Sequence, residues 1–119
     1  KYALIGSKGF STDDYCFLAK DKIDSRFKNE KKRLIKSYEA AQKEGYGDFI
    51  MFLHYPPTNM YEKNGVFTKL AQEFGVKRVV YSHLHGKERF DYSITGEHNG
   101  IDYTLVSSDY LDFTPKLII

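Results

Sequence analysis

The chain has 119 residues, 41% of them hydrophobic and 16% aromatic, which is the composition of one folded domain. Its 18 basic and 16 acidic residues leave a net charge of +2, and this balance excludes nucleic acid and anionic membranes as default partners. Apolar runs such as Phe49–Leu53 are too short to span a bilayer. The single cysteine, Cys16, excludes an internal disulfide and indicates a reducing compartment. We therefore expect one cytoplasmic domain over residues 1–119, with no nucleic-acid or membrane partner.

Hydrophobic periodicity predicts three strands and two helices in the first two thirds of the chain. Residues 2–6 have the character of a short strand, and residues 21–44 form the longest amphipathic pattern of helical period. Residues 48–53 and 77–82 are continuous apolar runs, which are typical of buried strands. Between them, residues 65–75 indicate a short helix. The alternation of strands and helices predicts an α/β layer in which helices pack on a sheet.

The last third of the chain changes to an alternating pattern. Residues 90–95 and 101–108 alternate in period two around the glycine-flanked segment 96–100, which predicts an antiparallel hairpin. Residues 111–119 are expected to form a further strand, at a sheet edge because of Pro115. The predicted sheet is therefore mixed, with flanking helices and a terminal hairpin.

Three of the four histidines directly follow predicted strands. His54 comes after the strand 48–53, and His83 and His85 come after the strand 77–82. Strands joined through a helix run parallel, so their carboxyl ends meet at one edge of the sheet, where open α/β sheets bind ligands. Imidazole is the commonest metal ligand in proteins near neutral pH. We interpret these three histidines as metal ligands rather than as hydrogen-bonded loop residues.

The residue types alone leave several functions open. Three imidazoles and a water would complete a mononuclear zinc site, whereas a two-metal phosphoesterase needs carboxylates as well. A noncatalytic interaction module is a further alternative. His98 lies in a polar turn and is expected to be exposed to solvent. The basic stretch 26–36 is expected to be the solvated face of the long helix rather than a nucleic-acid site, because Glu30 and Glu39 lie among its cations.

Longer segments around these histidines resemble a known family. The segments "FLHYPPTN", "GVKRVVYSHLHG" and "GIDYTLVSSDYLDF" resemble the C-terminal half of bacterial calcineurin-like metallophosphoesterases. His54 matches the lone histidine that this family has at a strand end. The sequence "SHLHG" matches its final Gly-His-x-His motif, with Ser82 in place of the glycine.

The resemblance implies a reaction and a set of ligands. His54 and His83 would bind one divalent metal ion and His85 a second, the ions being manganese, iron or zinc. A hydroxide activated by the two metals would hydrolyse a phosphoester whose identity the sequence does not give. Substrate-binding residues are unknown; for Tyr55 and Asn59 we favour ordinary turn chemistry over substrate contact.

The other motifs of the family are absent. They are Asp-x-His, Gly-Asp and Gly-Asn-His-Asp/Glu, and they carry the carboxylate ligands and the catalytic histidine. The one Gly-Asp pair, Gly47-Asp48, precedes a predicted strand instead of following one, so we interpret Asp48 as the start of that strand. We therefore expect the C-terminal half of a four-layer α/β/β/α sandwich, with no catalytic residue of its own and little activity alone. Its expected partners are the missing N-terminal half, or a second copy at the exposed sheet face.

Overall fold

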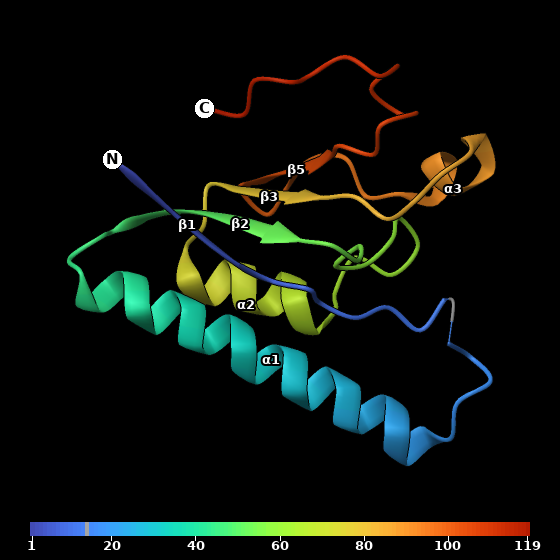
Figure 1. The fold of residues 1–119 in the computed structure, drawn as a ribbon, viewed down its shortest axis with the longest axis horizontal. Helices are drawn as coiled ribbons and strands as arrows, with labels where there is room; N and C mark the ends of the chain where they lie inside the picture. The colour runs from blue at the N-terminus through green and yellow to red at the C-terminus, as the bar shows by residue number, and fades with distance from the viewer. Residues whose placement is uncertain (14) are drawn as a thin grey trace.

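A computed structural model describes residues 1–13 and 15–119 of the chain. A five-stranded mixed sheet lies at the centre of the fold (Figure 1). In chain order the elements are β1 (Tyr2–Ser7), α1 (Lys20–Lys43), β2 (Asp48–Leu53), α2 (Val66–Phe74), β3 (Arg78–Tyr81), α3 (Lys87–Tyr92), β4 (Gly96–His98) and β5 (Ile101–Leu105). The strand order is β1-β2-β3-β5-β4. Each neighbouring pair is parallel except β4 with β5, which is antiparallel. The predicted α/β class and mixed sheet are confirmed.

Helices α1 and α2 lie together under one face of the sheet (Figure 1). The apolar stripe of α1 faces the strands, with Leu34 completely buried. Tyr38 of α1 stacks on Phe74 of α2 with ring centroids 3.8 Å apart. Met51 and Val79, at the centre of the sheet, fill the core beneath these helices. Burial of this apolar surface is the main driving force for the fold.

The predicted helices at 21–44 and 65–75 are confirmed to within one residue at each end. The C-terminus of α2 is fixed by Gly75, which has the left-handed φ of 65° that helix caps favour. Helix α1 is the longest helix, but its exposed face is strongly charged. Within the described part of the chain, no helix has both the length and the apolar character needed to cross a bilayer.

The opposite face of the sheet is only partly covered. Tyr2 and Leu4 of β1 are 44% and 61% exposed, whereas Ile50 in the next strand is buried. The C-terminal segment runs on this side of the sheet (Figure 1), and the Arg78 guanidinium donates a 3.0 Å hydrogen bond to the Ile118 carbonyl. The predicted sandwich would place a second sheet against this face, and that arrangement stays a prediction.

The predicted strand at 90–95 is wrong, because residues Lys87–Tyr92 form the helix α3. Three apolar residues at 90, 92 and 94 satisfy a period of two, but α3 ends at Tyr92 and the third of them, Ile94, lies beyond it. Phe90 packs against Tyr110, and Ile94 is buried with its carbonyl bonded to the Tyr81 hydroxyl. A short alternation therefore did not distinguish a helical turn from a strand.

The predicted hairpin is present, but its first strand lies inside the segment expected to be its turn. Strand β4 covers Gly96–His98 and pairs with β5. The turn is made by Asn99 and Gly100, whose φ angles of 54° and 79° are those of an Asn-Gly hairpin turn. The conformation of these two turn residues thus decides the register of β4 against β5.

The predicted strand at 111–119 is also wrong. Asp112 and Phe113 have left-handed φ angles of 53° and 56°, which no strand tolerates. The Phe113 N–H instead donates a 2.8 Å bond to the Ser108 carbonyl and closes a turn. The apolar end of the chain follows this turn as an irregular segment.

Candidate metal-binding site at the carboxyl edge of the sheet

The loops that leave the parallel strands lie at one edge of the sheet, which we call the carboxyl edge. Lys8 follows β1, His54 follows β2, His83 and His85 follow β3, and Asp109 lies in the segment after β5. The structure brings His54 and His83 together, with Nε2 of His54 3.1 Å from Nδ1 of His83. The sequence predicts that His54 converges with both His83 and His85; the structure confirms this for His83, whereas His85 bonds to Asp109.

Backbone hydrogen bonds hold the His54 loop in place. The N–H groups of His54 and Tyr55 both donate to the Lys8 carbonyl, at 3.1 and 3.0 Å. The His54 carbonyl accepts a 3.2 Å bond from the Ser82 N–H, which ties this loop to the loop after β3. Tyr55 is buried, and its hydroxyl lies 2.6 Å from that of Tyr15. Neighbouring loops therefore fix the backbone at His54.

His83 has an unusual backbone conformation. Its φ angle is +69°, in the left-handed region that residues with a Cβ seldom adopt. Such a conformation costs about 1–2 kcal/mol for a residue other than glycine. It lies just beyond the end of β3, and the Leu84 N–H bonds back to the Ser82 carbonyl at 2.8 Å. The ring of this strained residue contacts both His54 and Tyr55, with ring centroids 5.0 and 4.5 Å away.

The distance between the two imidazole nitrogens fits a shared metal ion. With metal–nitrogen bonds of about 2.1 Å, two ligands at octahedral or tetrahedral angles lie about 3.0–3.4 Å apart. The two rings form a hydrogen bond between Nε2 of His54 and Nδ1 of His83, and its length of 3.1 Å is within this range. These two side chains can therefore occupy adjacent positions around one divalent ion.

The electrostatics of the edge favour the neutral, metal-binding form of His54. Its pKa is lowered from 6.5, first by partial desolvation of the ring and then by the nearby His83, Lys8 and His85. Only the neutral imidazole has a lone pair for a metal. Desolvation and these neighbours thus favour the neutral form of His54.

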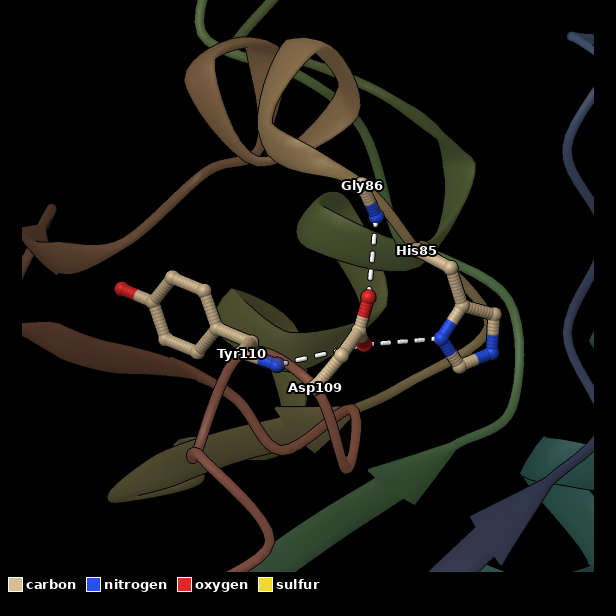
Figure 2. Close-up of polar contacts among 4 residues, drawn as sticks. All are labelled: His85, Gly86, Asp109 and Tyr110. Carbon is tan, nitrogen blue, oxygen red and sulfur yellow. Dashed lines mark hydrogen bonds and ion pairs between the residues drawn. The ribbon is translucent and has the colours of Figure 1, made fainter.

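His85 has a different partner (Figure 2). Its Nδ1 lies 2.8 Å from Oδ1 of Asp109, which also accepts the Tyr110 N–H at 3.1 Å, while Oδ2 accepts the Gly86 N–H at 3.0 Å. The hydrogen bond with His85 is the main cause that lowers the pKa of Asp109. A carboxylate on Nδ1–H places the lone pair of the ring on Nε2 and fixes its orientation. His85 therefore presents Nε2 away from Asp109.

The described side chains supply only part of a metal coordination sphere. Across residues 1–13 and 15–119, no three or more histidine, cysteine, aspartate or glutamate side chains gather around one point. The His54–His83 pair and the His85–Asp109 pair are separate arrangements. Asp48 is the first residue of β2 and lies at the other edge of the sheet, as the sequence indicates.

Two further residues have structural contacts. His98 lies away from the carboxyl edge, and it is half-buried rather than exposed, because its ring packs near Tyr103 and its Nε2 donates to the Thr95 carbonyl at 2.9 Å. The side-chain oxygen of Asn59 accepts two backbone N–H groups of the following turn, at 2.9 and 2.8 Å. These bonds are the turn chemistry that we favoured for this residue.

Sequence reasoning missed Asp109 and Lys8. Asp109 follows β5, and the prediction paired that strand only within a hairpin, whereas it also runs parallel to β3. That parallel pairing is what brings the segment after β5 to the carboxyl edge. Lys8 follows the first strand, as the histidines follow theirs, and its place after a strand end was the available signal.

No model of a known protein family matches the chain, and no curated protein or solved structure matches it either. The function proposed below therefore depends on the geometry of the site and on the resemblance of its sequence motifs.

Proposed function

We propose that this chain supplies the histidine ligands of a cytoplasmic two-metal phosphoesterase of the calcineurin-like type. The observation that supports the proposal most strongly is the 3.1 Å separation between Nε2 of His54 and Nδ1 of His83. These imidazoles come from two parallel strands and lie at the edge where α/β sheets bind ligands. Their order and spacing along the chain also match the last two metal-binding motifs of that family.

Each residue has a distinct role in this proposal. His54 and His83 hold one divalent ion (manganese, iron or zinc), and His85, oriented by Asp109, holds the second. When bound, the two ions neutralise charge on the phosphoryl group and lower the pKa of a water molecule. Lys8 adds positive charge beside His54, which attracts the anionic substrate.

The proposal requires further ligands. Carboxylates that compensate the charge of two ions, and the general acid of the reaction, must come from outside residues 1–119. A partner that covers the exposed β1 side of the sheet, around Tyr2 and Leu4, would be placed to contribute them. The partner is either an N-terminal half of the same enzyme or a second chain. Residues 1–119 alone are expected to show little hydrolysis.

The proposal is tested with the protein purified at its natural length and loaded with Mn²⁺. We expect hydrolysis of a chromogenic aryl phosphate, and a loss of at least about 100-fold in kcat/KM for His54→Ala and for His83→Ala. His98→Ala is the matched control, since His98 lies away from the site and its substitution leaves the rate unchanged. Full activity in the His54→Ala and His83→Ala proteins would contradict the proposal.

Metal stoichiometry distinguishes the alternatives. Two ions per active molecule are expected, with one lost in the His54→Ala protein. One tightly bound zinc ion without hydrolysis of any phosphoester would instead identify a mononuclear zinc-binding or interaction module.

A further inference from the structure

A large pocket opens beside the histidine loops. Its volume is about 860 Å³, which is within the range of small-molecule sites. Pro56 in its wall is two residues after His54, so their Cα atoms lie at most about 7.6 Å apart. Leu84, which also lines the pocket, stands between His83 and His85. A molecule bound in this pocket would therefore be next to the candidate metal site.

Two exposed tyrosines form part of the pocket wall. Tyr61 and Tyr92 are 80% and 55% exposed, and their ring centroids lie 5.3 Å apart at an angle of 52°. Tyr61 belongs to the loop between β2 and α2, and Tyr92 ends α3. Aromatic faces open to solvent in a pocket are suited to stacking on a planar ring of a ligand.

The backbone holds the two tyrosines in this arrangement. The Met60 N–H donates a 3.0 Å bond to the Tyr92 carbonyl. Asn59 and Ser93 also pair in an antiparallel bridge. The loop that carries Tyr61 is thus attached to the end of α3, so little conformational freedom is lost when a ring binds.

The polar residues of the pocket indicate what else the ligand contains. Asp13 and Glu62 contribute carboxylates, which accept hydrogen bonds from sugar hydroxyls, as acidic residues do for ribose in dinucleotide sites. Arg89 contributes one cation beside the two carboxylates, so the described lining residues carry no net positive charge. This charge balance disfavours an acidic peptide, and the carboxylates would be costly beside a purely apolar chain.

We propose that this pocket binds the nucleoside part of a nucleotide phosphoester, with the base against Tyr61 and Tyr92 and the phosphate toward His54 and His83. The ring pair, the carboxylates and the adjacent metal site then match the base, the sugar and the phosphate of one ligand. The assignment of the phosphate end rests on the proposed function, whereas the assignment of the nucleoside end does not.

The test measures binding to residues 1–119 by isothermal titration calorimetry and NMR, with adenosine, adenosine 5′-monophosphate and ribose 5-phosphate as probes. Adenosine and the monophosphate are expected to bind, and ribose 5-phosphate, which lacks a base, to bind at least tenfold more weakly. Tyr61→Ala and Tyr92→Ala should each weaken adenosine binding about tenfold. Tyr92→Phe, which keeps the ring, should bind as the unsubstituted chain does.

Tyr46→Ala is the matched control, because Tyr46 is an exposed tyrosine just before β2, at the opposite edge of the sheet. Its substitution should leave adenosine binding unchanged. Insensitivity of binding to both pocket substitutions, or equal binding of ribose 5-phosphate and the monophosphate, would overturn the nucleoside proposal. Adenosine contains no phosphate and needs no metal, so its binding supports the pocket even where the hydrolysis experiment contradicts the phosphoesterase.

Discussion

The two edges of the sheet use polar residues in different ways. At the amino edge, where β3 and β5 begin, Arg78 and Asp102 form a 2.7 Å ion pair, and the guanidinium also bonds to the Ile118 carbonyl. At the carboxyl edge, His54 and His85 are exposed to solvent, and His83 has a left-handed backbone. The first arrangement joins two charges of the chain to each other, whereas the second leaves His54 and His85 open to solvent, although His85 also bonds to Asp109.

Under the proposed function, this difference separates residues that stabilise the sheet from residues that would bind metal. The pair at the amino edge satisfies its own charges and fastens the C-terminal segment to the strands. The histidines at the carboxyl edge bury little apolar area, and one of them requires a strained conformation. Residues of that kind are expected where a site is built at the expense of stability.

The largest effect on stability is expected for a substitution in the middle of β2, compared with one just beyond its carboxyl end. Met51 is completely buried, so Met51→Ala should lower the free energy of unfolding by about 2–5 kcal/mol through the cavity it leaves. His54→Ala, three residues later and exposed, should change it by less than about 0.5 kcal/mol. Urea denaturation of both variants provides the measurement. A large loss of stability in His54→Ala would show that the carboxyl edge is structural.

Whether the sequence predicts an element of the fold depends on the length of its hydrophobic pattern. Helix α1 was predicted because its apolar stripe repeats over 24 residues, and β2 because its apolar run is continuous. The convergence of His54 and His83 followed from parallel topology alone. Residues 90–95 were misassigned because three alternating apolar positions are too few to distinguish a strand from a helix end followed by a loop. The Asp109 contact was missed because it depends on the β3–β5 pairing and on the turn after β5, neither of which leaves a periodic signal.

The next effect concerns the strain at His83. Glycine normally costs about 0.5–1 kcal/mol relative to alanine, but at a left-handed position the order reverses. His83→Gly should therefore be more stable than His83→Ala by about 1 kcal/mol. Both variants should lose the His54–His83 pair and the metal binding proposed for it. The difference in urea midpoint between the two variants, at constant m-value, measures this difference in stability. An alanine variant as stable as the glycine variant would show that the backbone at residue 83 relaxes.

A smaller effect is expected at the amino edge. Both side chains of the Arg78–Asp102 pair are partly exposed, so Asp102→Asn should cost at most about 1 kcal/mol. The loss should shrink at high salt, because screening weakens the pair in the unsubstituted chain. Metal binding at the carboxyl edge should be unaffected. A change in metal affinity would contradict the separation of the two edges.

The smallest effect concerns the titration of His54. Its pKa lies below 6.5 in the folded chain, so the unfolded chain binds a proton more readily. The stability linked to this group is therefore present above pH 6.5 and is lost as the pH falls through the folded-state pKa. Removing a positive neighbour by His83→Ala or Lys8→Met should raise the pKa of His54 toward 6.5. A metal-free NMR titration of the imidazole signals measures the shift, and an unchanged pKa in both variants would contradict the proposed electrostatics.

Metal binding by His54 and His83 is tested most simply by ¹⁵N NMR of all histidine ring nitrogens while Zn²⁺ is added to residues 1–119. Zinc is expected to move the signals of Nε2 of His54 and Nδ1 of His83 together, while the signals of His98 stay in place. The substitution His54→Ala is expected to abolish the zinc response at His83. Independent responses of the two histidines, or a response of His98 at the same zinc concentration, would show that the pair does not form a metal site.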